Sequence, residues 1–371
     1  MADHDIFGNP PYRYLPTQHM LAIAAAPEQG EDVYTNTAPL WHPAWARGVF
    51  GGALLAQSLA VAQESIPLSY LAHSMHCHFL LPAHTTTPIF YRIERIRDGR
   101  TIAIRRVQAY QSGKCIFTAL VSFFHQAERK ERMELTHQPT MPEYSRGQEP
   151  PSASGEDVDQ TRLTRTCQAN RGSQYECVRI SAGEEETRPE SRRLRNWIRV
   201  HSQASAGSHA NHGQGRNTDH RAHLTALAYI SDHYFIGTVP RVHRTDRFNS
   251  SSAIKSIIRS LGSDDPSSRQ IVRSYQELAT EELEENARCG TPTAPAHHIG
   301  MMVTLDHTIF FHNQAVVRAD EWMLTEVETP WAGQQRGLVV QRIWTSNGTL
   351  VATCFQEGLV RLERNEAGSK I

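Results

Sequence analysis

Hydrophobic positions follow two different periods in the first third of the chain. Residues 51–62 (GGALLAQSLAVA) are apolar nearly all round, which is typical of a helix buried on every side. Four strand-like runs follow, at 71–81, 89–96, 101–110 and 115–124. Asp98-Gly99 and Ser112-Gly113 supply turn chemistry between them. One helix followed by an antiparallel meander predicts an α+β unit over about residues 30–126.

The same order returns in the last part of the chain. A short apolar helix at 224–234 precedes strand-like runs at 301–311, 321–328, 336–345 and 349–361. Ser346-Asn347-Gly348 is a strong hairpin signal between the last two runs. Three stretches align between the halves: 73–79 with 304–310, 109–113 with 343–347, and 116–122 with 350–356. Identities are few, but order, turns and apolar phase agree, which indicates an internal duplication.

Two inserts of low hydrophobicity interrupt this pattern. Residues 127–223 contain linker-like composition and a possible strand pair at 174–180 and 194–201. The second insert, about 240–298, includes a Glu-rich periodic stretch at 271–287 that predicts an exposed helix. We therefore expect three parts: a first unit at 1–126, a linker and insert at 127–223, and a second unit at 224–371.

Composition and charge limit the classes of function. The chain has 371 residues, enough for two domains, and 39% hydrophobic residues, which suits a real core. Lys plus Arg is 38 and Asp plus Glu is 39, so nothing favours nucleic acid as a partner. No run of about 18 apolar residues predicts a membrane span. Six scattered cysteines and an acidic N-terminus without an apolar leader favour a reducing compartment.

The familiar nucleophile and cofactor motifs are missing from the sequence. It has no G-x-S-x-G elbow, P-loop, G-x-G-x-x-G fingerprint or H-E-x-x-H pair. The histidines His73, His76 and His78 suggest a metal, but on a strand only the last two share a face. Without a third ligand on that face we expect no metal and no cofactor.

Asp232 is the more promising group. The phrase Tyr229-Ile230-Ser231-Asp232 places a carboxylate within a mostly apolar helix, where it is costly unless hydrogen-bonded. A structural Asp, acting as an N-cap or held in a salt bridge, is the alternative. Thr304 and Gln356 lie on strand-like runs of the same unit, so all three can meet. A carboxylate can accept a proton from water while a hydroxyl and an amide orient that water.

The ordered motifs resemble the type II acyl-CoA thioesterases, the double hot-dog family that includes bacterial thioesterase II and peroxisomal acyl-CoA thioesterases. The motifs that carry the resemblance are Val49-Phe50-Gly51-Gly52, His73-Ser74-Met75-His76, Phe79-Leu80-Leu81-Pro82, Arg97-Asp98-Gly99-Arg100, Leu227-Ala228-Tyr229-Ile230-Ser231-Asp232, Leu305-Asp306-His307, Phe311-His312, Glu321-Trp322 and Phe355-Gln356-Glu357-Gly358. The resemblance covers about two thirds of the chain. It implies two tandem hot-dog units, in which an antiparallel sheet wraps a central helix.

The resemblance also implies an activity and a site. Asp232, Thr304 and Gln356 match the family's catalytic Asp, Thr or Ser, and Gln, which activate a water for hydrolysis of acyl-CoA. His73 and Ser122 are then the first-unit counterparts of Thr304 and Gln356, so that unit is a non-catalytic copy. Substrate contacts are expected from His73 and from backbone N–H groups near Gly51 and Gly52. The insert at 240–298 departs from compact family members.

Location and assembly follow as further expectations. Ser369-Lys370-Ile371 is close to the S-K-L tripeptide read by the peroxisomal import receptor, which predicts a peroxisomal and otherwise cytoplasmic enzyme. Hot-dog sheets commonly pair, so a homo-oligomer is expected.

Three other functions stay open at this point. A hot-dog enoyl-CoA hydratase needs an Asp/His dyad, which Asp306-His307 superficially supplies, although neighbours on a strand face opposite ways. A thioesterase that releases a CoA-bound secondary metabolite is also compatible with the inserts. A non-catalytic acyl-binding protein is disfavoured because all three catalytic residue types are present.

Overall fold

The fold combines helices with a large antiparallel sheet in the computed structural model. The structure describes residues 19, 21–43, 46, 48–126, 133–144, 148–151, 175–180, 188–201, 215–233, 235–245, 269, 272–273, 276, 279–280 and 297–364. The first half contains helix α2 (Gly51–Glu64) and strands β1 (Ile23–Ala25), β2 (Val33–Asn36), β3 (Tyr70–Phe79), β4 (Phe90–Asp98), β5 (Ile102–Gln111) and β6 (Lys114–His125). The second half contains helices α4 (Gly215–Ser231) and α5 (Thr238–Val242) and strands β7 (Tyr175–Ile180), β8 (Arg193–Val200), β9 (His297–Thr304), β10 (Asp306–Phe311), β11 (Met323–Gly333), β12 (Arg336–Thr345) and β13 (Leu350–Arg364).

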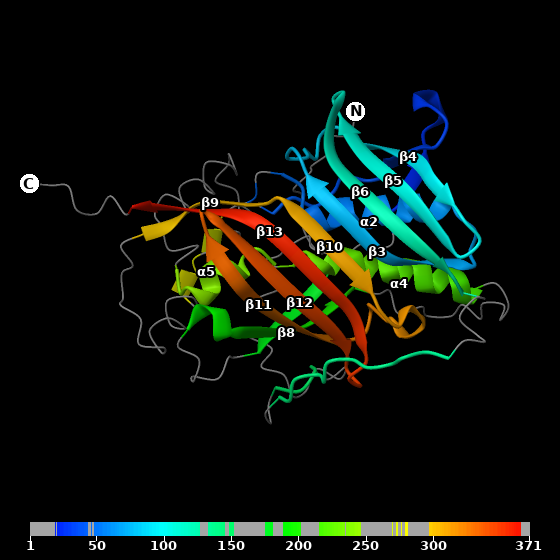
Figure 1. Ribbon diagram of the computed structural model, residues 1–371. Helices are drawn as coiled ribbons and strands as arrows, with labels where there is room; N and C mark the ends of the chain where they lie inside the picture. The colour runs from blue at the N-terminus through cyan, green and yellow to red at the C-terminus, as the bar shows by residue number, and fades with distance from the viewer. Residues whose placement is uncertain are drawn as a thin grey trace, which may run out of the picture.

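One sheet runs through both halves of the molecule (Figure 1). Its strand order is β1-β2-β4-β5-β6-β3-β10-β13-β12-β11-β8-β7, and β9 also pairs with β13. The halves meet where β3 pairs with β10 in antiparallel register, with Met75 opposite Ile309. Because both strands are central in this order, neither half has a free edge at the junction.

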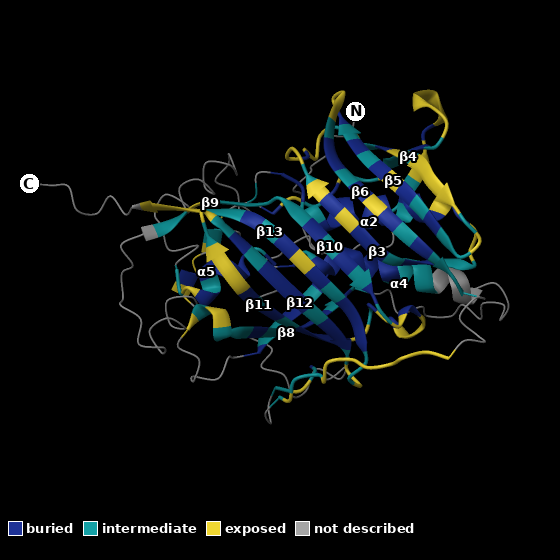
Figure 2. Ribbon diagram, viewed as in Figure 1, coloured by how far each residue is buried: buried dark blue, intermediate teal, exposed yellow. Residues whose placement is uncertain are grey.

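Helices α2 and α4 pack against each other on one side of this sheet (Figure 1). Helix α2 is buried along almost its whole length. Leu55 and Leu59 of α2 and Leu227 of α4 are fully buried. The strands that lie over the two helices are buried along much of their length (Figure 2). Full burial explains why α2 is apolar all round rather than on one face only. Among the residues that the structure describes, no helix has the length and apolar character needed to cross a membrane.

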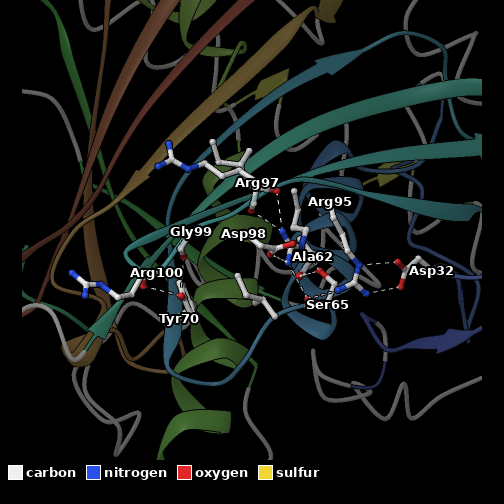
Figure 3. Close-up of polar contacts among 12 residues, drawn as sticks. Asp32, Ala62, Ser65, Tyr70, Arg95, Arg97, Asp98, Gly99 and Arg100 are labelled. Atoms are coloured by element: carbon white, nitrogen blue, oxygen red, sulfur yellow. Dashed lines mark hydrogen bonds and ion pairs between the residues drawn. The ribbon is translucent and has the colours of Figure 1, made fainter.

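Arginines of the first unit fix the C-terminal end of α2. Arg95 pairs with Asp32 at 3.0 Å and donates to the Ser65 carbonyl (Figure 3). The buried Arg105 donates to the Ser65 hydroxyl at 2.9 Å and also pairs with Asp98. Cations at a helix C-terminus interact favourably with its dipole. These contacts fix the C-terminal end of α2 within the first unit.

Most predicted elements are confirmed with shifted ends. The buried helix, the eight strand-like runs, the strand pair β7–β8 and the turns at Ser112-Gly113 and Asn347-Gly348 are all present. The pair β7–β8 extends the sheet, because β8 pairs with β11. The predicted helix at 271–287 lies mostly outside the described residues; those described within it, at 272–273, 276 and 279–280, are helical.

Two predicted element ends were wrong in ways that matter for the site. The helix expected at 224–234 starts at Gly215 and ends at Ser231, so Asp232 is the first residue after it. The strand expected at 301–311 is broken at Leu305. There, residues 305 and 306 lie opposite Glu357 alone: Leu305 N–H donates to the Glu357 carbonyl, and the Asp306 carboxylate accepts from Glu357 N–H. This is a β-bulge in a strand that otherwise continues along β13.

The internal alignment of the two units also needs correction. In the β5–β6 hairpin, Tyr110 pairs with Cys115, and residues 111–114 connect them. In the β12–β13 hairpin, Trp344 pairs with Leu350, and the connecting residues 345–349 are one residue longer. This extra residue shifts the expected match of 116–122 with 350–356 by one position. The pair Arg105–Val121 therefore corresponds to Val339–Gln356, and Val121, not Ser122, is the counterpart of Gln356.

The same shift applies on β3. The pairing of β3 with β6 is irregular at His73, between Ala72 and Ser74, just as β9–β10 bulges at Leu305. Aligning the two bulges makes His73 the counterpart of Leu305 and Ala72 the counterpart of Thr304. A one-residue slip turns every side chain to the other face of a sheet, so the expected equivalences joined residues of opposite faces.

Candidate active site

Asp232 lies where the end of α4 meets the start of α2. No side chain of the first unit caps the N-terminus of α2, and the Asp232 carboxylate accepts a hydrogen bond from Gly52 N–H instead. A Cβ on Gly51 would lie 2.6 Å from the Asp232 carboxylate, and one on Gly52 would lie 2.1 Å from the Tyr229 carbonyl oxygen. Two glycines are therefore required for this approach of the helices.

The surroundings of Asp232 make it a weak acid. Burial raises the pKa of Asp232 to about 7, against an ordinary value of 3.8, while hydrogen bonds from Gln356 and Gly52 N–H act in the opposite direction. The residue keeps some accessible surface, but protein atoms surround the carboxyl group closely enough for desolvation to dominate. A carboxylate with such a pKa is suited to accept a proton near neutral pH.

Gln356 lies on β13 directly against Asp232. Its Nε2 donates to Asp232 Oδ1 at 2.7 Å, and its side chain is fully buried. Its Oε1 is also buried and has no hydrogen-bond partner among the described residues. Because a buried amide oxygen without a hydrogen bond is costly, this atom would gain from any donor that reaches it.

The bulge at Leu305 directs Thr304 toward the same site. Thr304 pairs with Gly358, which is two residues from Gln356 on β13, so the side chains of 304 and 356 are diagonal neighbours on one face. His307 faces this way too, although it is three residues from Thr304, because the bulge adds one residue between them. The Thr304 hydroxyl makes no hydrogen bond within the part of the chain that the structure describes.

Two polar residues join the cluster that the sequence analysis did not assign to it. Ser231 Oγ lies 3.0 Å from His307 Nε2, and His307 Nδ1 lies 3.4 Å from Gln356 Nε2. Ser231 and His307 are fully buried. Both belong to motifs of the family resemblance, Ser231 beside Asp232 and His307 within Leu305-Asp306-His307. Their position in the sequence, beside predicted site residues, was the signal that could have assigned them to the site.

The histidines of β3 lie elsewhere. His73 Nε2 makes a 2.8 Å hydrogen bond with the Ser122 hydroxyl. In the β3–β10 register Cys77, not His73, is opposite His307, which puts His73 four residues along the strand from the cluster. His76 contacts Thr308 at 3.2 Å. The described residues contain no group of three or more His, Cys, Asp or Glu side chains placed to hold a metal ion.

The hydratase dyad does not form. The Asp306 carboxylate accepts from Glu357 N–H at 3.0 Å, whereas both ring nitrogens of His307 face Ser231 and Gln356 in the interior. The two side chains therefore serve different sides of the strand and cannot act together on one substrate.

Comparisons with known proteins agree with this arrangement. Models described as the acyl-CoA thioesterase N-terminal and C-terminal domains match residues 38–124 and 146–360. Acyl-coenzyme A thioesterase 8 of Mus musculus is 29% identical over 356 residues, which cover 92% of this chain and 88% of the mouse protein. Peroxisomal acyl-coenzyme A thioester hydrolase 1 of Saccharomyces cerevisiae is 23% identical over 356 residues, covering 86% of this chain and 87% of the yeast protein.

A solved structure supports the fold. An acyl-CoA thioesterase II from Mycobacterium marinum superposes with a TM-score of 0.59 at 22% identity, covering 94% of this chain and 99% of that chain. The predicted double hot-dog architecture is therefore confirmed.

Proposed function

Because the chain belongs to the acyl-CoA thioesterase family and is an acyl-CoA thioester hydrolase, we propose that Asp232, Thr304 and Gln356 activate its hydrolytic water. One observation carries this assignment: Gln356 binds the Asp232 carboxylate at 2.7 Å while its own Oε1 is buried without a partner. A water that bridges the carboxylate and Oε1 satisfies both. Thr304, on the same face, offers a third contact to that water.

The hydrolysis then proceeds without a covalent enzyme intermediate. The water oxygen attacks the thioester carbonyl carbon while one water proton passes to Asp232 and the other stays hydrogen-bonded to Gln356 Oε1. The Thr304 hydroxyl donates to the water oxygen. When the tetrahedral intermediate collapses, the carbon–sulfur bond breaks and the CoA thiolate takes the proton from Asp232. The products are the free acid and CoA.

The start of α2 is the proposed site of the thioester carbonyl. The N-cap residue Phe50 makes no side-chain hydrogen bond to the helix, Gly52 N–H binds the Asp232 carboxylate, and Gly51 lies against both Asp232 and the ring of Phe79. Backbone N–H groups at a helix N-terminus are well placed to stabilise an oxyanion. Gly51 and Gly52 are therefore assigned to substrate binding, whereas the substrate contact expected from His73 stays a prediction.

Thiol release measured on a panel of acyl-CoA chain lengths tests this proposal. We expect Asp232→Asn and Gln356→Ala to lower kcat about 10²–10⁴-fold, the usual contribution of a positioned acid–base group. Thr304→Ala, which removes one contact to the water, is expected to lose less. Undiminished turnover in Asp232→Asn would exclude the carboxylate as the base. Water addition to an enoyl-CoA without thiol release would instead favour the hydratase.

Location and assembly are further parts of the proposal. The name of the yeast relative and the terminal Ser369-Lys370-Ile371 support a peroxisomal enzyme that the import receptor recognises; the tripeptide lies outside the described residues. A fluorescent fusion at the N-terminus should give punctate peroxisomal signal that becomes diffuse when the tripeptide is deleted. We also propose a non-catalytic unit at 1–126, a catalytic unit at 224–371 and a homo-oligomer, which light scattering tests.

A further inference from the structure

The orientation of the Gln356 amide decides whether the proposed site works. An amide can rotate by half a turn and exchange its oxygen and nitrogen at nearly no steric cost. In the observed orientation Nε2 faces Asp232 and Oε1 is left for the water. In the other orientation the amide oxygen would face the carboxylate, and the water would lose its acceptor. Something in the structure must therefore hold the observed orientation.

Asp232 can hold it for only part of the reaction. As a carboxylate, Asp232 Oδ1 accepts and so requires the N–H side of the amide. Once Asp232 has taken the proton of the water, its hydroxyl can donate to an amide oxygen equally well. Protonated Asp232 therefore no longer distinguishes the two orientations of the Gln356 amide. This happens while the tetrahedral intermediate is bound.

A second chain of hydrogen bonds distinguishes them throughout. Ser231 has one hydroxyl proton, and it donates that proton to the Ala228 carbonyl at 2.8 Å. Its oxygen must therefore accept from His307 Nε2–H, 3.0 Å away. That leaves His307 Nδ1 without a proton, as an acceptor for the second N–H of Gln356 at 3.4 Å. A bare Nδ1 repels an amide oxygen, so only the observed orientation is satisfied.

The surroundings keep this chain in one state. His307 is fully buried, with the Phe235 ring packed on it at 5.3 Å, and burial lowers its pKa to about 3, so the ring stays neutral at working pH. Cys77 faces it from β3, and burial raises the pKa of that thiol, which therefore stays neutral as well. The neighbouring Asp306 carboxylate is occupied by Glu357 N–H.

We propose that His307 and Ser231 are positioning residues that lock the Gln356 amide with Oε1 toward the hydrolytic water through both protonation states of Asp232. This inference rests on the proposed catalytic group. It concerns residues that touch neither water nor substrate and act through Gln356 alone.

His307→Leu removes the Nδ1 acceptor and puts an apolar side chain of similar size in its place. We expect kcat to fall about 10–100-fold with KM changed less than about 2-fold, the signature of an interaction needed only in the transition state. His307→Asn, whose Oδ1 can take the place of Nδ1, should recover most of the lost kcat. The matched control is His312→Leu, because His312, the residue after β10, also contacts β13, through Thr353 Oγ1 at 3.0 Å, and has no hydrogen bond to Gln356. It should leave kcat within about 2-fold.

A double-mutant cycle separates positioning from a structural role. In a Gln356→Ala background there is no amide to orient, so His307→Leu should lower kcat no further. Equal losses in both backgrounds, or a raised KM with unchanged kcat, would overturn the inference. If His307→Leu does not fold, Ser231→Ala replaces it in the cycle. Without the Ser231 hydroxyl, the His307 ring can carry its proton on either nitrogen. We expect this variant to lower kcat several-fold, and only when Gln356 is present.

The two proposals fail in distinguishable ways. Loss of the proposed function shows as a wild type that releases no thiol, or as full activity in Gln356→Ala. Loss of this inference alone shows as an active wild type, an impaired Gln356→Ala and a His307→Leu variant with unchanged kcat.

Discussion

Among single side chains, Asp232 should set the pH dependence of the reaction. With its pKa raised to about 7, kcat/KM should rise through neutral pH and level off above about pH 8, as the carboxylate forms. Since the hydrogen bond from Gln356 lowers this pKa, Gln356→Ala should move the midpoint upward while reducing the rate. A pH–rate profile of both proteins measures this. A midpoint near 4 in the wild type would contradict the assignment.

The same carboxylate should make the protein less stable than it could be. A pKa above the ordinary 3.8 means that the fold favours the protonated form, so this contribution to stability is present below about pH 4 and is lost as pH rises through about 7. Asp232→Asn removes the titration. At about 1.4 kcal/mol per unit we expect it to raise the free energy of unfolding by up to about 4 kcal/mol at pH 8 and little at pH 4.

Urea unfolding at the two pH values tests this expectation, with activity recorded in parallel. The predicted pattern is a variant that gains stability and loses turnover. A variant that is less stable at pH 8 than the wild type would instead identify Asp232 as a structural residue, the alternative left open from the sequence.

Chemistry was more predictable from sequence than geometry. Asp232 and Gln356 were predicted as partners from the family motifs, and the structure places them in direct contact. Ser231 and His307 were quoted in those motifs, yet their hydrogen bonds depend on the approach of α4 to β10, which no local pattern encodes. The alternation of apolar residues likewise did not show that Val121 is the counterpart of Gln356. One extra residue in the β12–β13 hairpin shifts the alignment of the two units by one position.

Among helices and strands, the elements with strong apolar periodicity were predicted best. The all-round apolar pattern of α2 gave its position to within two residues. Helix α4 was predicted too short because its first turns, Gly215 to His223, are polar and show no apolar face. The bulge at Leu305 was missed because a bulge is a property of a strand and its partner together.

The contact between α2 and α4 gives a prediction about two adjacent glycines. Gly52→Ala would bring Cβ to 2.1 Å from the Tyr229 carbonyl oxygen, a backbone atom that cannot rotate away. We expect a loss of about 1–3 kcal/mol or more in unfolding free energy, as for overpacked cores. Gly51→Ala meets side chains instead, Asp232 at 2.6 Å and the Phe79 ring at 2.9 Å, so it should chiefly lower activity.

Gly113→Ala is the control for both variants. Gly113 has a φ of +75° and open space around its Cβ, so it should lose only about 1 kcal/mol from the left-handed backbone and keep full kcat. Chemical denaturation and thiol release on all three proteins separate the effects. The packing argument is wrong if Gly52→Ala is no less stable than Gly113→Ala.

Across the whole molecule, the site requires both halves, and Arg221 is one of the residues that join them. From α4 it donates to the carbonyls of Gln63 at 2.7 Å, Ile66 at 3.1 Å, Pro67 at 2.6 Å and Tyr70 at 3.1 Å, at the C-terminal end of α2. It thus anchors one end of α2 to α4, while Gly52 and Asp232 meet at the other. Burial lowers the pKa of Arg221, but a guanidinium stays charged at neutral pH.

We therefore expect Arg221→Met to lower the free energy of unfolding by about 3 kcal/mol, since hydrogen bonds from a charged group are worth about 1.5–3 kcal/mol each. Three of the four carbonyl hydrogen bonds that are lost are part-buried and the fourth is exposed. Arg221→Lys, with the charge but fewer fixed donors, should lie in between. Arg106→Met is the matched control, because Arg106 is an exposed residue paired with Glu94 and such pairs contribute about 0–1 kcal/mol. Activity should disappear in the same urea transition as the fold, because helices from both halves build the site. Activity lost well before a second transition would mean that the halves unfold separately and that Arg221 does not couple them.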